Sequence, residues 1–251
     1  DPAYTAWWQK DSKLSAPKNS NLKTVMDFSF FDKINTAKNE QTETWFKGLD
    51  RIYNNFVYDF LYPNPASVLA FIENHDTDRF LGEGNNLPML KQASTLLLTT
   101  RRIPQLYYGT EVMMNGVKSK SDGYVRKDFP GGWTGDATNA LTPAGRTKIQ
   151  NECYDFYKTI LNWRKGNDVI AKGSMVQFMV QNGVYAYARQ YEGKTIFVML
   201  NGTDAETTVP LKFYKEILKD SKQGKDILSG KAITFGEELK MGPRESLVIE
   251  L

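Results

Sequence analysis

The sequence predicts an α/β region followed by an all-β region, and three observations support this. Apolar runs of strand length alternate with helical stretches up to about residue 165. Beyond Gly166 the pattern changes to short strands separated by two-residue turns. The chain has 251 residues, of which 41% are hydrophobic and 24% charged, the composition of a globular protein. We therefore expect two domains, residues 1–165 and residues 166–251.

Three strand–helix units are predicted in the α/β region. The strands are expected at residues 23–31, 67–72 and 103–108. The second is an unbroken apolar run, as in a buried parallel strand. The helix after the first strand carries four apolar residues at helical spacing: Trp45, Leu49, Ile52 and Phe56. The helix after the second strand should cover residues 87–100.

A long polar, glycine-rich loop is expected at residues 115–140, before the last helix of this region. Thr142 and Pro143 suit the N-cap and the first turn of that helix. Its buried face should carry Ile149, Cys153, Phe156, Tyr157 and Ile160. Cys153 is the only cysteine, which excludes an intrachain disulfide, and we expect a buried thiol there.

The all-β region is predicted to be an antiparallel sandwich. Residues 175–181 and 184–191 flank Asn182-Gly183, a strong signal for a two-residue hairpin. Glu192-Gly193 then leads into a strand at residues 195–200, which Asn201-Gly202 ends. Further short strands are expected at residues 226–235 and 246–251. A meander with turns at such short intervals is typical of a sandwich.

Charge and spacing exclude several classes of function. The net charge is +3, from 32 basic and 29 acidic residues spread along the chain, without the basic stripe typical of nucleic-acid binding. There is no apolar run long enough to span a membrane. Metal-ligand spacings are also absent, so we expect no metal and no cofactor bound by this chain.

The most informative segment is Phe-Ile-Glu-Asn-His-Asp-Thr-Asp-Arg-Phe, residues 71–80. It places the only histidine, His75, beside Asp76 at the point where the second strand ends in a polar loop. An adjacent imidazole and carboxylate can bind a vicinal diol through neutral and charge-assisted hydrogen bonds.

The whole string closely resembles the Phe-x-x-Asn-His-Asp-x-x-Arg motif of the α-amylase family of glycoside hydrolases. Two further segments are similar to the family. Residues 103–111 resemble the motif of its eighth barrel strand, although Arg102 stands where the family prefers glycine, which puts the close approach of that loop in doubt. Residues 122–133 resemble a loop of cyclomaltodextrinases and neopullulanases.

The resemblance implies that residues 1–165 form the C-terminal part of a (β/α)8 barrel, which alone takes about 250 residues. The family's nucleophilic aspartate and general-acid glutamate should lie outside this chain. Arg126-Lys127-Asp128 and Glu43-Thr44-Trp45 mimic their motifs, but in a loop and in a predicted helix, and we discount both. The remaining N-terminal part of the enzyme is thus an expected partner, and a calcium site on it stays open.

The resemblance also implies roles for individual residues. Asp76 would be the third carboxylate, which stabilises the transition state, and His75 would bind the same sugar. Arg126 and Asp128 would bind the next sugar, with Trp133 or Phe129 stacking nearby.

Three further residues are expected to have a structural role near the site, and sugar binding is not expected of them. Asn74 would fix the loop, and Glu111 would anchor neighbouring loops. For Arg79, orienting a carboxylate and bracing the loop are equal alternatives.

The expected activity is hydrolysis, with retention, of α-1,4-glucosidic bonds in cyclodextrin, pullulan and starch-derived maltodextrins, so an α-glucan oligosaccharide is the expected ligand. A transglycosylase of the same fold and a non-catalytic glucan-binding protein are the alternatives. By resemblance the protein would be periplasmic or secreted, and an oligomer stays open.

Overall fold

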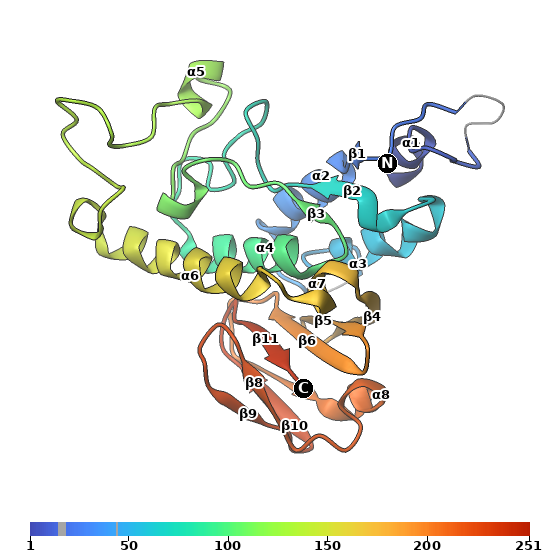
Figure 1. Ribbon diagram of the computed structural model, residues 1–251. Coiled ribbons are helices and arrows are strands. Elements are labelled where there is room, and N and C mark those ends of the chain that lie inside the picture. The colour runs from blue at the N-terminus through green and yellow to red at the C-terminus, as the bar shows by residue number, and fades with distance from the viewer. Residues whose placement is uncertain (15–18, 44) are drawn as a thin grey trace.

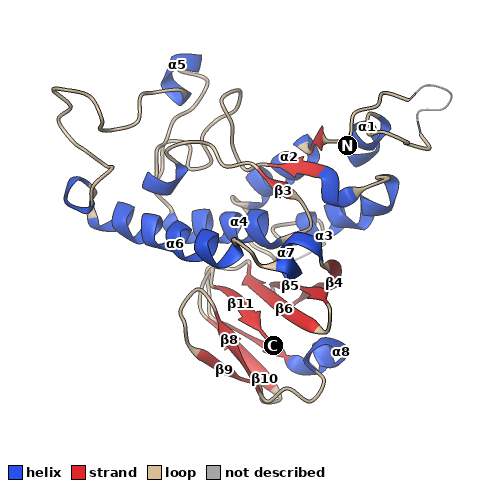
Figure 2. Ribbon diagram, in the orientation of Figure 1, coloured by secondary structure: helices blue, strands red, loops and turns tan. Residues whose placement is uncertain are grey.

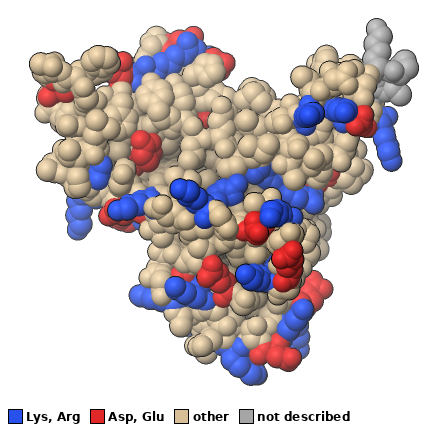
Figure 3. Space-filling view, in the orientation of Figure 1, with Lys and Arg blue, Asp and Glu red and all other residues tan. Residues whose placement is uncertain are grey.

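A computed structural model describes residues 1–14, 19–43 and 45–251. Figure 1 shows two layers: helices around a small sheet above, and a β domain below. The colouring by secondary structure in Figure 2 shows that nearly all of the strand content lies in the lower layer. On the face drawn in Figure 3, basic and acidic side chains are interspersed, so neither sign dominates that surface.

The small sheet has three parallel strands in the order β1-β2-β3. These are β1 (Val25–Met26), β2 (Val68–Ala70) and β3 (Ile103–Pro104), each shorter than predicted. Val25 pairs with Val68, and Leu69 pairs with Ile103. The three strands therefore run side by side in chain order.

The prediction of a first strand through residue 31 was wrong. Asp27 accepts a hydrogen bond from the backbone N–H of Phe30 and thereby caps α2 (Phe28–Ala37), so residues 28–31 are helical. The second predicted helix is confirmed as α4 (Leu87–Thr99).

The helix predicted around Trp45 is shorter than expected. It is α3 (Asp50–Val57), and Trp45 lies outside it with 75% of its surface exposed, although Ile52 and Phe56 are buried. The remaining helices of this layer are α1 (Pro2–Trp7), α5 (Asp122–Val125), α6 (Lys148–Arg164) and α7 (Asp168–Lys172).

The start of α6 also differs from the prediction. Thr142 caps a separate 3-10 turn, Pro143–Gly145, and α6 begins after a capping box formed by Thr147 and Gln150. Four of the five residues of its predicted face are buried, but Ile149 is not. Among the described residues, no helix combines the length and apolarity that crossing a bilayer requires.

An antiparallel six-stranded sheet in the order β4-β5-β6-β11-β8-β9 forms the β domain. Its strands are β4 (Ser174–Gln181), β5 (Val184–Tyr191), β6 (Lys194–Asn201), β8 (Gln223–Asp226), β9 (Ala232–Thr234) and β11 (Ser246–Glu250). The predicted Asn182-Gly183 hairpin is confirmed, with φ of 49° and 78° as a type I′ turn requires. The predicted strand at residues 226–235 is instead the turn after β8 followed by β9.

Both faces of this sheet are covered. A two-stranded sheet of β7 (Thr207–Pro210) and β10 (Glu238–Met241), with α8 (Lys215–Leu218), lies in the same domain. One apolar cluster joins α2, α3, α4 and α6 to one face of the large sheet through Tyr185, Tyr187 and Val198. A second cluster joins the opposite face to the β7–β10 pair through Ala186, Phe197 and Met241. Burial on two faces explains why β5 and β6 are apolar almost without interruption.

Arg189 on β5 ties the two layers together. Its side chain is 1% exposed and donates to the carbonyls of Thr99, Ile170, Gly173 and Ser174 at 2.8–3.1 Å. Burial lowers the pKa of this guanidinium to about 10. The end of α4, the middle of α7 and the Gly173 that follows α7 are thus bound to one side chain of the β domain.

We predict that Arg189→Met lowers the free energy of unfolding by about 3 kcal/mol or more, because it leaves buried carbonyls without a donor. Urea titration and the melting temperature measure the loss. Lys212→Met, at an exposed position, is the matched control and should change neither value appreciably. Equal stability of the two variants would contradict a role for Arg189 in joining the layers.

Candidate functional site

The predicted His75–Asp76 loop leaves the carboxyl end of β2 after two buried residues, Phe71 and Ile72. Asn74 turns the chain at this point. Its backbone N–H donates to Thr77 Oγ1 (3.0 Å), and its Oδ1 accepts from the backbone N–H of Asp76 (2.8 Å). These bonds fix the backbone of the loop. They do not use the side chains of His75 and Asp76.

His75 and Asp76 point into solvent, with 61% and 59% of their side chains exposed. His75 Nε2 lies 3.2 Å from Asp76 Oδ2. An exposed carboxylate and an imidazole thus stand side by side at a strand end, where a ligand can reach both.

Arg126, at the end of α5, brings the long loop to this pair. Its Nε donates to the His75 carbonyl (2.8 Å), and its Nη2 lies 3.0 Å from Asp76 Oδ1. Lys118 Nζ donates to the Asp76 carbonyl (3.0 Å). Two cationic side chains from residues 115–140, Arg126 and Lys118, therefore bind the His75–Asp76 loop.

Asp122 is a site residue that the sequence analysis missed. Its carboxylate lies 3.4 Å from Arg126 Nη2 and 3.3 Å from Lys118 Nζ. The signal was present, because Asp122 and Arg126 are four residues apart, the spacing at which side chains meet on a helix. Asp122 therefore helps to hold the guanidinium that contacts Asp76.

A buried ion pair lies beneath the exposed loop. Glu73 Oε1 and Arg79 Nη1 are 3.1 Å apart, and their side chains are 2% and 1% exposed. Arg79 also donates to the carbonyls of Val125 (3.0 Å) and Tyr108 (2.7 Å), and it lies over the ring of Tyr107 at 3.9 Å. Arg79 thus links the segment after β2, the segment after β3 and the end of α5.

Glu73 was noted in the motif but received no role from the sequence. Besides Arg79, it accepts hydrogen bonds from the Thr110 hydroxyl and the backbone N–H of Phe80. Burial raises the pKa of the Glu73 carboxyl, and these donors oppose the rise. A glutamate directly after the apolar pair Phe71-Ile72 was the available signal for a buried, paired carboxylate.

Other predicted residues are not joined to Asp76. Asp128 is exposed and Trp133 is 73% exposed, and no hydrogen bond or ion pair within the described ranges links either to the pair. Glu111 lies half-buried in a 3-10 turn, Thr110–Val112, likewise without such a bond. The discounted motif Glu43-Thr44-Trp45 includes Thr44, which lies outside the described residues.

Arg102, which replaces the glycine that the family prefers, is fully buried. Its guanidinium bonds to the carboxylate of Asp59, and its Nε lies 3.2 Å from Asp27 Oδ2. Gly109, at the exit of the third predicted strand, has φ of 81°, and a Cβ there would clash with the Met114 side chain. The turn after β3 therefore depends on Gly109, while Arg102 belongs to a charge network beside it.

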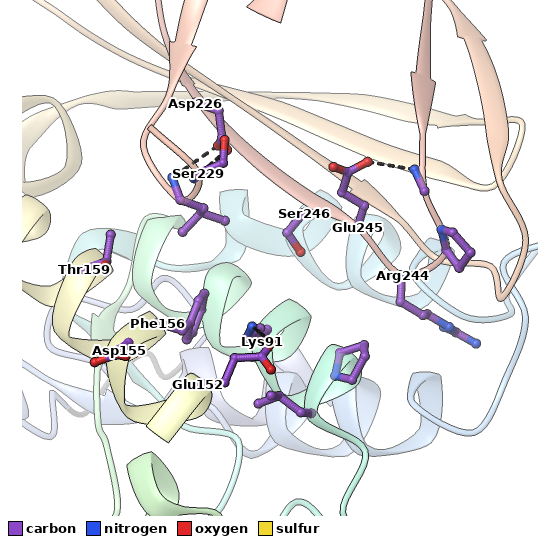
Figure 4. A pocket seen from close by; sticks show the side chains of 15 residues that line it. Lys91, Glu152, Asp155, Phe156, Thr159, Asp226, Ser229, Arg244, Glu245 and Ser246 are labelled. Carbon is purple, nitrogen blue, oxygen red and sulfur yellow. Dashed lines mark hydrogen bonds and ion pairs between the residues drawn. The ribbon is translucent and has the colours of Figure 1, made fainter. Parts of the chain in front are cut away.

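A cavity of about 580 Å³ lies between the helical layer and the β domain (Figure 4). It is formed by α4, α6 and the loops around β8 and β11, and none of its 15 lining residues is a predicted site residue. In the described part of the chain, no group of three or more His, Cys, Asp and Glu side chains is placed to hold a metal ion. The thiol of Cys153 is buried, and burial raises its pKa to about 12.

Comparisons with known proteins show that this chain is similar to part of α-amylases and cyclomaltodextrin glucanotransferases. Residues 175–250 match the family described as the cyclo-malto-dextrinase C-terminal domain. An α-amylase of Niallia circulans is 28% identical over 226 residues, covering 87% of this chain and 38% of that protein. A cyclomaltodextrin glucanotransferase of Thermoanaerobacterium thermosulfurigenes is 30% identical over 217 residues, covering 83% of this chain and 28% of that protein.

Solved structures show the same fold. An Anoxybacillus α-amylase superposes with a TM-score of 0.76 at 20% identity, covering 100% of this chain and 50% of that one. An α-amylase of Geobacillus thermoleovorans, solved with acarbose, gives a TM-score of 0.75 at 21% identity, with coverage of 100% and 51%. By these similarities the chain corresponds to the C-terminal part of an α-amylase-family enzyme, and it spans only 38% and 28% of the length of the two curated relatives.

We predict that Arg79→Met is more destabilising than the double variant Glu73→Leu with Arg79→Met. Removing one partner of a buried pair leaves an uncompensated charge and costs about 3–5 kcal/mol, whereas removing both avoids that charge. Urea titrations of the two single variants and the double variant measure the coupling between the sites. Additive losses would show that the two side chains do not depend on one another.

Proposed function

We propose that this chain forms part of the active site of a retaining enzyme that cleaves α-1,4-glucosidic bonds in α-glucans such as cyclodextrin, pullulan and starch-derived maltodextrins. The observation that carries the proposal is the contact of Arg126 with His75 and Asp76. It holds an exposed carboxylate at a fixed place on the rim of a parallel sheet. Active sites of βα barrels are built at that rim.

The proposal includes a (β/α)8 barrel, of which residues 1–165 are the C-terminal part, with residues 166–251 as the β domain. The order β1-β2-β3 and the helices after each strand support it. Met26 on β1 and Ile103 on β3, the two outer strands, are 39% and 40% exposed, as expected where further strands add to the sheet. The N-terminal part would supply the nucleophile and the general acid, so this chain alone would be inactive.

Asp76 would act on the transition state. In retaining glycosidases two carboxyl groups about 5–5.5 Å apart do the covalent and acid–base work, and positive charge develops on the sugar ring. A fixed negative charge beside that ring binds the transition state more tightly than the ground state. His75 would bind a hydroxyl of the same sugar, and Arg126 would keep the carboxylate in place.

The outer part of the site would be the loop at residues 115–140. Arg126, Asp128 and Trp133 lie on it, and the exposed rings and polar groups suit a second sugar. A solved relative described as AmyP is complexed with maltotriose, and the Geobacillus thermoleovorans amylase with acarbose, which supports oligosaccharide binding.

Transglycosylation by the same site is the second candidate. The observation that favours it is the similarity to cyclomaltodextrin glucanotransferases, at 30% identity in one case. A non-catalytic glucan-binding protein is disfavoured. The negative charge of Asp76 would stabilise positive charge that develops only during a reaction, and binding alone does not require this.

We predict that Asp76→Asn in the complete enzyme lowers kcat by about 10²–10³-fold, with a much smaller change in substrate binding. The substitution keeps the shape and removes the charge, so the loss falls on the transition state. His75→Ala should cause a smaller loss, shared between kcat and KM. Steady-state kinetics on maltodextrin measures both, and Asp220→Asn, on the exposed surface of the β domain, is the control. A near-normal kcat for Asp76→Asn would show that Asp76 only anchors its loop.

We also predict that replacing Arg126 and Asp128 with alanine changes the preference among cyclodextrin, pullulan and starch without abolishing hydrolysis. The loop on which they lie borders Asp76, so it limits which glucans fit. Relative kcat/KM values for the three substrates give the ranking. Arg189→Met should lower stability and leave the ranking unchanged. The reverse result would mean that the β domain, and not the loop, selects the substrate.

A further inference from the structure

A second cavity, of about 650 Å³, lies far from the His75–Asp76 loop. It is formed by residues within 42–43 and 45–54, around the start of α3, and by the turn between β4 and β5. None of its lining residues belongs to the candidate site. In Figure 1, α5 marks the candidate site at the upper end of the molecule, while β4 and β5 lie in the lower layer.

Exposed aromatic rings line this cavity. Trp45 is 75% exposed and Phe46 is 61% exposed, with Tyr53 half-buried beside them. Phe46 has φ of 62°, an uncommon conformation for a residue with a side chain, and its N–H donates to Asp50 Oδ2 (2.6 Å). Together the exposed rings give the cavity an apolar platform, which is a mark of a binding surface.

The polar groups of the cavity indicate the kind of ligand. Its lining contains carboxylates, side-chain amides and hydroxyls but neither lysine nor arginine. A site without a cation is unsuited to phosphates and other anions. The Asp50 carboxylate accepts hydrogen bonds from Phe46 N–H and from Asn54 Nδ2 (2.8 Å), both at Oδ2.

Other polar side chains remain available. Gln181 and Glu43 line the cavity, and within the described ranges their side chains make no hydrogen bond. Rings for stacking, together with free neutral and acidic hydrogen-bonding groups, match a ligand with apolar faces and hydroxyl edges. Sugars have that chemistry.

We propose that this cavity is a second binding site for a neutral oligosaccharide, with Trp45 and Phe46 as the platform and Gln181 at its edge. Its volume falls within the range of about 300–1,000 Å³ common for ligand sites. That the oligosaccharide is an α-glucan rests on the proposed function.

The cavity in Figure 4 does not offer the same chemistry. Its one aromatic residue, Phe156, is only 9% exposed, and Lys91 and Glu152 pair with each other at 2.7 Å. The role of the Trp45 site would be to hold a long glucan while another part of it is cleaved. Two linked contacts raise the affinity for a long chain beyond that of either alone.

Calorimetric titration of the complete protein with maltoheptaose tests the proposal, in an Asp76→Asn background that prevents cleavage. We expect two binding events. Trp45→Ala should weaken one of them about tenfold through loss of ring stacking and leave the other unchanged. Gln181→Ala should weaken the same event, and it provides the test if Trp45→Ala lowers the melting temperature. Phe213→Ala, which removes a ring that is 44% exposed elsewhere on the β domain, is the matched control and should change neither event.

The outcomes separate this proposal from the proposed function. One binding event that His75→Ala weakens and Trp45→Ala does not would overturn the second site and leave the proposed function standing. Absence of any binding would overturn both. Binding of cellohexaose in place of maltoheptaose at Trp45 would overturn the α-glucan assignment, and an effect of Phe213→Ala equal to that of Trp45→Ala would overturn the site.

Discussion

The candidate site depends on the buried ion pair between Glu73 and Arg79. Arg79 binds the segment after β2 through Glu73, the segment after β3 through the Tyr108 carbonyl, and α5 through the Val125 carbonyl. One buried side chain thus contacts all three segments. Burying two charges gains little stability by itself, so the value of the pair lies in the geometry that it imposes.

That geometry separates a rigid base from an exposed surface. Glu73 and Arg79 are almost fully buried, whereas His75 and Asp76, two and three residues after Glu73, are largely exposed. The Asn74 turn makes this change within one residue, because its side chain binds the Asp76 backbone. A reactive carboxylate needs both conditions: access to a ligand, and a support that does not move when the ligand binds.

The β domain contributes by packing on the helices. One face of its large sheet completes the core of the helical layer, and Arg189 adds bonds to the carbonyls of Thr99, Ile170 and Gly173 across the junction. The same junction brings the β4–β5 turn against residues within 42–43 and 45–54 and so creates the cavity at Trp45. The two proposed binding surfaces therefore lie at different places on one continuous framework.

Local sequence alone determined the hairpin at Asn182-Gly183, the helix α4, the burial of Cys153 and the motif at residues 71–80, because each depends on backbone preference or on a short periodic pattern. Only the tertiary structure decided the rest. Arg126 meets Asp76 across 50 residues of chain, and Arg102 meets Asp59 across 43. Trp45 has helical spacing to Leu49 and yet lies exposed outside α3. The physical reason is that these contacts join residues far apart in the chain. A local sequence pattern does not specify which distant residue a side chain will meet, whereas packing and charge pairing in the folded protein do.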